Sequence, residues 1–133
     1  MNDGLLRTFR RPRLWLALWG VLIAAVIAGS LLPADELPVP PFAGFDKLEH
    51  AFGYGMLSAY AMMLFARRRT QAWAAVGLVV LGIAIEVAQA RWTSSRSGDP
   101  SDVLADLIGV LAGSSIASTT WACGLRRLDA WLR

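Results

Sequence analysis

The side chains in this sequence that could carry out proton-transfer chemistry are a histidine and a set of carboxylates on three separate segments. Asp46 and His50, the one histidine of the chain, lie four residues apart, and Tyr54 follows at the same interval. Residues at this interval lie on one face of a helix. A histidine oriented by a neighbouring carboxylate is a common general base. The spacing therefore predicts a polar helix face that contributes His50 to a site.

Two later segments carry polar faces of the same kind. Glu86 and Gln89 lie three residues apart and Asp102 and Asp106 lie four apart, so each pair shares a helix face. All four lie within or beside long apolar blocks, where a charged side chain costs roughly 3 kcal/mol unless it finds a partner. Such faces can satisfy one another only by facing inward. We therefore predict a polar pocket among the three segments, with His50, Glu86 and Asp106 as candidate proton-transfer groups.

Further polar residues around these groups are predicted to bind a ligand: Asp46, Lys47, Tyr54, Gln89, Arg96 and Asp102. Lys47 and Arg96 are the cations that would contact an anionic head group. A metal centre would need His50 together with carboxylates from other segments. Because the chain has one histidine and no compact ligand spacing, the sequence predicts no metal and no cofactor.

The elements that must position these residues are long apolar blocks. The chain of 133 residues is 56% hydrophobic and 17% charged, and its mean hydropathy is +0.47, which is typical of membrane proteins. Four blocks have about the 20 residues that a bilayer-spanning helix needs: 14–32, 48–66, 72–90 and 103–122. Short links between them make neighbours antiparallel. We predict an all-α polytopic membrane protein, one domain over 1–133, with four transmembrane helices in a compact antiparallel bundle.

The basic residues predict the orientation of the chain in the membrane. Ten of the 13 lysines and arginines lie in 7–13, 67–69 and 126–133, whereas Lys47, Arg91 and Arg96 lie on the other side. The positive-inside rule then places both termini in the cytoplasm. These clusters interrupt apolar blocks and form no basic helical face, which argues against nucleic acid despite a pI near 9.8. Residues 125–133 are predicted to form a short amphipathic tail on the cytoplasmic surface.

Local signals add detail to the helices. The first apolar block of 19 residues is longer than the 7 to 15 of a signal peptide, which favours a retained membrane helix. Asp99 followed by Pro100 is typical of a helix N-cap and first helical position. Gly109 and Gly113 form a small-residue face suited to close helix contact. Trp15 is expected near the inner membrane boundary.

The same polar residues carry a family resemblance. The stretches DKLEHAFGYG and IEVAQARWTSSRSGDPSDVLADLIGVLAG resemble the VanZ-like family of small bacterial membrane proteins. The family pattern is DK-x-x-H with a nearby Tyr, then E-x-x-Q, an Arg, and D-x-x-x-N-x-x-G-x-x-x-G. The matching residues are Asp46, Lys47, His50, Tyr54, Glu86, Gln89, Arg96, Asp102, Gly109 and Gly113. Asp106 stands where the family commonly has Asn, which adds a negative charge to the pocket.

The resemblance implies a bacterial inner-membrane protein of the cell envelope. The founding member is associated with raised tolerance to the glycopeptide teicoplanin, and no reaction is established for the family at large. The leading hypothesis is that the chain binds or modifies a lipid or a lipid-linked envelope precursor, and whether it is an enzyme stays open. Two alternatives are a non-catalytic assembly protein, with a membrane protein or a second copy as partner, and a proton-coupled small transporter. The inner halves of the helices lack the ionisable residues that a transport route needs.

Overall fold

The computed structural model describes residues 4–33, 36, 39–92 and 98–132. These residues form α-helices and short 3₁₀ helices, and they contain no strand beyond one isolated antiparallel bridge between Leu6 and Phe65. The elements in order are α1 (Pro12–Leu31), α2 (Phe45–Leu64), α3 (Arg68–Trp92), α4 (Pro100–Ser114), η2 (Ser115–Ser118), η3 (Thr120–Cys123) and α5 (Gly124–Trp131). The predicted all-α class is confirmed.

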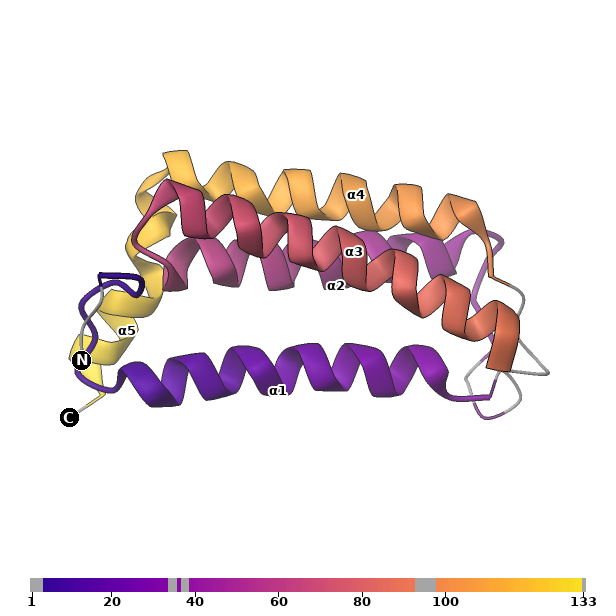
Figure 1. Ribbon diagram of the computed structural model, residues 1–133, viewed down its shortest axis with the longest axis horizontal. Coiled ribbons are helices and arrows are strands. Elements are labelled where there is room, and N and C mark those ends of the chain that lie inside the picture. Colours follow the sequence, from indigo (N-terminus) through magenta and orange to yellow (C-terminus); the bar gives the residue numbers. More distant parts are fainter. Residues whose placement is uncertain (1–3, 34–35, 37–38, 93–97, 133) are drawn as a thin grey trace.

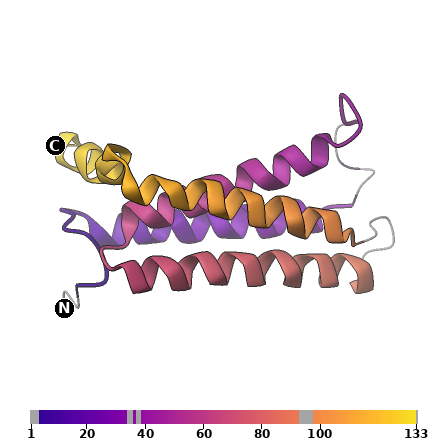
Figure 2. The same cartoon turned by 90° about the horizontal axis from the view of Figure 1, so that it is seen from above.

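The four long helices run back and forth along one axis, and α5 lies at the same end as the described N-terminal segment (Figure 1). Helix α2 is central, because it contacts α1, α3, α4 and α5, whereas α1 contacts only α2 and α3 among the long helices. Figure 2 shows that α2 crosses α4 rather than running parallel to it. The N-terminal half of α2 therefore lies where the start of α4 and the end of α3 can meet it.

Three helices are long and apolar enough to cross a membrane: Pro12–Leu31, Arg68–Trp92 and Pro100–Ser118. Their outward surfaces carry large apolar side chains that water would not favour, such as Val21 at 62% and Leu111 at 63% exposure. These features indicate a membrane protein. The 20-residue α2 is not among the three. The reason is its composition, because its first turns carry Asp46, Lys47 and Glu49.

The helix boundaries differ from the predicted ones mainly at the end of the fourth block. The α-helix ends at Ser114, and 3₁₀ turns follow as far as Cys123, although the sequence predicted one helix to residue 122. The cause is a run of hydroxyl side chains that bond backbone carbonyls three residues earlier. Ser115 donates to Ala112, and Thr119 donates to Ile116. Such local bonds compete with the regular helix ladder.

Helices α2 and α4 approach closely because glycines line the contact, as the sequence predicted. A side chain on Gly109 would collide with the carbonyl oxygen of Ala51, and one on Gly113 would collide with that of Gly55. Further along, Ser58 donates to the carbonyl of Val110 at 2.9 Å. The two backbones are therefore in direct contact over several turns, which fixes the rotation of α2 relative to α4.

At the opposite end of the bundle, α5 is held to α1 by a buried carboxylate. Asp129 is 3% exposed and accepts hydrogen bonds from the Trp15 indole at 2.8 Å and from the Arg10 backbone. The ring of Trp15 is buried and packs with Leu64 and Leu125, and its place near the inner membrane boundary stays a prediction. The predicted amphipathic tail is a helix, but part of its apolar face covers the protein rather than a membrane surface.

The glycine contact predicts a selective loss of stability. Changing Gly109→Ala should lower the free energy of unfolding by about 1–3 kcal/mol, the usual cost of overpacking, because the new methyl group meets the Ala51 carbonyl. Gly77→Ala on α3 is the matched control, because nothing lies within 4 Å of its added methyl group. Thermal unfolding in detergent, followed by tryptophan fluorescence, measures both. Equal stability of the two variants would contradict the close contact.

The Asp129 bonds predict a change with pH. Burial opposes the charged carboxylate, but hydrogen bonds from Trp15 and from the Arg10 backbone outweigh it, so the pKa of Asp129 lies below its usual value. The stabilisation should therefore be complete above the unfolded-state pKa of about 3.9 and disappear as the pH falls through the lowered folded-state value. Wild type should be more stable than Asp129→Asn at pH 7, and the difference in melting temperature should shrink below about pH 4. A difference independent of pH would refute this role.

Candidate functional site

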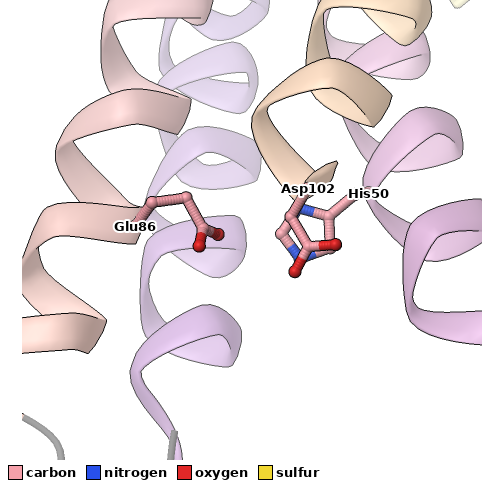
Figure 3. A group of neighbouring side chains, drawn as sticks. All are labelled: His50, Glu86 and Asp102. Carbon is pink, nitrogen blue, oxygen red and sulfur yellow. The ribbon is translucent and has the colours of Figure 1, made fainter. Parts of the chain in front are cut away.

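The predicted polar residues meet at one end of the bundle. The start of α2, the end of α3 and the start of α4 lie at the end opposite α5 (Figure 1). Figure 3 shows His50, Glu86 and Asp102 directed toward one another from these three helices. The structure therefore brings together residues that lie up to 52 positions apart in the sequence, between 50 and 102. We call His50, Glu86, Asp102 and Asp106 the polar cluster.

The hydrogen bond between His50 and Asp106 lies at the centre of the cluster. Nδ1 of His50 lies 2.9 Å from Oδ1 of Asp106, whose side chain is almost fully buried. The direction of this bond depends on the tautomer of His50: with its proton on Nδ1, the ring donates to the carboxylate of Asp106. Nε2 of the same ring lies 3.9 Å from Oδ2 of Asp102. Asp106 fits between the helices because Gly82 of α3 leaves space, since a side chain there would collide with Oδ2 of Asp106.

Lys47 reaches across from α2 to the first turn of α4. Its ammonium group lies 2.9 Å from both Asp99 and Asp102 and 3.4 Å from Asp46. Asp99 is the N-cap of α4, as predicted, and its carboxylate accepts from the Ser101 backbone at 2.8 Å. These bonds from Ser101 and Lys47 hold the pKa of Asp99 below its usual range. Lys47 is thus paired within the protein, although the sequence suggested that it would contact an anionic head group.

Glu86, the member of the polar cluster from α3, is buried, and one of its two carboxylate oxygens has no hydrogen-bond partner among the described residues. The side chain is 6% exposed, and Oε2 accepts from the Asp99 backbone at 2.7 Å. Oε1 is buried and has no hydrogen-bond partner among the described residues, and the same is true of Oδ2 of Asp106 and the Tyr54 hydroxyl. Buried polar atoms in proteins are nearly always paired. These three atoms come from α2, α3 and α4, and each would accept a hydrogen bond from, or donate one to, water or a bound group.

The other residues predicted to bind a ligand do not lie in the centre of the polar cluster. Gln89 is buried and donates to the backbone carbonyl of Ser30 at 2.8 Å, which ties α3 to the end of α1. Asp46 has a half-exposed side chain at the margin of the cluster. Arg96 lies outside the described residues. Three residues near the site were not predicted to belong to it from the sequence: Gly82, Glu49 and Asp99. The position of Gly82, one turn before Glu86 on the same helix face, could have indicated that it lies beside the site.

A cavity of about 290 Å³ opens next to the polar cluster. Helix α1 forms an apolar wall, and α2 forms a polar wall that includes His50. The lining residues are Ala25, Val26, Gly29, Ser30, Asp46, Glu49, His50, Gly53 and Tyr54. The sequence predicted a pocket among the second, third and fourth helices. The polar side chains do meet among α2, α3 and α4, but the cavity lies between α1 and α2. His50 belongs to the polar cluster and also lines the cavity.

We compared the chain with known proteins in three ways. A scan against protein-family models finds no match, and searches of curated proteins and of solved structures find no similar protein.

The cluster predicts an unusual tautomer for the one histidine of the chain. In metal-free buffer, at a pH where the ring is neutral, wild-type His50 should carry its proton on Nδ1 because Asp106 accepts it. Nitrogen NMR of protein labelled with ¹⁵N-histidine measures which ring nitrogen is protonated, and the one histidine of the chain should give one pair of ring-nitrogen signals. Asp106→Ala should shift the proton toward Nε2. Asp46→Asn is the control and should leave the spectrum unchanged. An unaltered spectrum in Asp106→Ala would contradict the bond.

Proposed function

We propose that the chain is a multi-pass protein of the bacterial inner membrane, with four membrane helices and both termini in the cytoplasm. Three apolar helices and the central α2 of similar length support this number. The clustered arginines near the α5 end support the orientation, because basic residues favour the cytoplasmic side. The polar cluster and the cavity would then face the outer leaflet and the envelope space.

We further propose that this site binds or modifies an amphiphilic cell-envelope component, a lipid or a lipid-linked precursor. The observation that carries the proposal is the cavity with one apolar and one polar wall. An amphiphile needs both kinds of surface, a polar surface for its head group and an apolar one for its chain. Ala25 and Val26 of α1 would contact the chain, while His50 and Tyr54 would contact the head group.

The size of the cavity fits a head group rather than a whole lipid. Its volume of about 290 Å³ is at the lower end of small-molecule pockets, about 300–1,000 Å³. Only the first part of an acyl chain would therefore lie against Ala25 and Val26, and the rest would extend along the exposed apolar surface of α1, of which only Trp15 is buried. The resemblance of residues 45–115 to the VanZ-like family supports the same envelope setting, including a role in glycopeptide tolerance.

Proton transfer is the chemistry best suited to this site if the component is modified. His50 borders the cavity and is oriented by Asp106, as a general base must be. Glu86 lies near it with one free carboxylate oxygen and would serve as the second proton-transfer group.

A non-catalytic assembly role is the second candidate, and the close α2–α4 contact favours it. Buried polar groups such as Asp106 and Ser58 can serve simply to fix how helices pack. In that case Glu86→Gln, which keeps the side-chain volume, would leave any cellular phenotype intact. Loss of the phenotype with normal membrane insertion would instead favour a binding or catalytic site.

Filling the cavity from α1 tests head-group binding without substituting any residue of the polar cluster. We expect Gly29→Leu to abolish the enrichment of a specific lipid that copurifies with wild type, because the new side chain enters the cavity from α1. Gly20→Leu on the same helix is the control, since nothing lies within 4 Å of its added Cβ and it does not line the cavity. Lipid mass spectrometry of the purified proteins gives the comparison. Identical lipid profiles in all three would refute the proposal.

A further inference from the structure

We propose that His50, Glu86 and Asp102 bind a divalent transition-metal ion, of the kind represented by Zn²⁺ and Mn²⁺. One ligand atom from each of the three side chains lies within 4.8 Å of the others. Figure 3 shows the three groups converging from α2, α3 and α4. The sequence predicted no metal because these residues have no compact spacing, but the fold supplies the proximity that the spacing lacks.

The donor set suits such an ion. Imidazole nitrogen favours zinc and similar metals, and carboxylate oxygen is accepted by both zinc and manganese. Three protein ligands would leave a coordination position for water or for a bound group, which is typical of catalytic zinc sites. With Nε2 on the ion and Nδ1 on Asp106, His50 would be a ligand rather than a general base in the metal-bound protein. Ligand bonds are about 2.0–2.2 Å long, so the donors would need to draw together by about an ångström. The flexible side chain of Glu86 can supply most of this movement.

The orientation of His50 is that of a metal-binding histidine. Metal-bound histidines commonly donate their other ring N–H to a carboxylate, which fixes the ring and increases its basicity. Here Nδ1 lies 2.9 Å from Asp106, and Nε2, on the other side of the ring, lies 3.9 Å from Oδ2 of Asp102. Asp106 would thus be a positioning residue rather than a ligand. The two oxygens of Asp102 have different partners: Oδ1 pairs with Lys47, and Oδ2, on the side of His50, would bind the ion.

The unused oxygen of Glu86 is independent support. Oε1 lies in a side chain that is 6% exposed and has no hydrogen-bond partner among the described residues. The local charge also calls for a cation. Asp46, Asp99 and Asp102 share the ammonium group of Lys47, while Glu86 and Asp106 have no lysine or arginine partner within the part of the chain that the structure describes. A divalent ion would neutralise this excess.

Metal binding to the full-length protein tests the proposal and needs no lipid ligand. After chelator treatment and desalting in detergent, wild type should bind one Zn²⁺ or Mn²⁺ per chain in a titration with the metal alone, checked by elemental analysis. His50→Ala, Glu86→Gln and Asp102→Asn should each lose this ion. Asp106→Asn should weaken binding about 10–100-fold, as expected for a residue that orients a ligand. Asp46→Asn should bind like wild type, because its carboxylate is not among the three donors.

Further readings distinguish a true site from a folding defect. Each variant should keep its size-exclusion profile, and the metal should raise the melting temperature of wild type and Asp46→Asn but not of the three ligand variants. Gly29→Leu should still bind the ion, since it fills only the cavity, so failure of head-group binding and failure of metal binding are separable. Absence of stoichiometric Zn²⁺ and Mn²⁺ binding by wild type, or equal binding by Glu86→Gln, would overturn the proposal.

Discussion

The arrangement of the polar cluster depends on the direct contact between the backbones of α2 and α4. Gly109 lies one turn after Asp106, and Ala51 directly follows His50, so the collision-free approach at Gly109 places the two functional side chains opposite each other. A bulkier residue would separate the helices and lengthen this hydrogen bond. The small residues are therefore part of the site, although none of them carries a functional group.

The same contact explains why α2 tolerates polar residues in an otherwise apolar chain. Charged groups in a membrane are stable only where they face protein or water. Helix α2 turns one face toward α1, α3 and α4, where Tyr54 and Ser58 are buried, and exposes Leu48, Phe52 and Met56 on another. Lys47 pairs with the carboxylates at the start of α4. The three apolar helices in turn present their leucines and valines outward. The bundle is consistent with a bilayer because most polar residues lie on α2 and at the start of α4, while α1, α3 and α4 supply apolar outer surfaces.

Much of the fold and part of the site could be predicted from the sequence. Hydropathy located the helices to within about four residues except at the end of the fourth, which stops at Ser114. The four-residue interval correctly placed His50 and Asp106 on inward faces. The glycines of α4 correctly indicated a close contact. The interval could not predict how far each helix is rotated, and so Gln89, three residues after Glu86, contacts α1 instead of the cluster. The reach of the long Lys47 side chain and the effect of serines at the end of α4 depend equally on tertiary context.

His50 is the point at which the cluster and the cavity meet, which constrains how the site could work. One edge of its ring is fixed by Asp106, while the same side chain borders the space between α1 and α2. A group bound in the cavity would therefore act on the buried carboxylates through this ring, and a change in the cluster would alter the cavity wall. Because α1 contributes no ionisable side chain to that cavity, it can vary its apolar surface without disturbing the cluster. Selectivity for the apolar part of a ligand and chemistry at its polar part would then reside on different helices, joined by one imidazole.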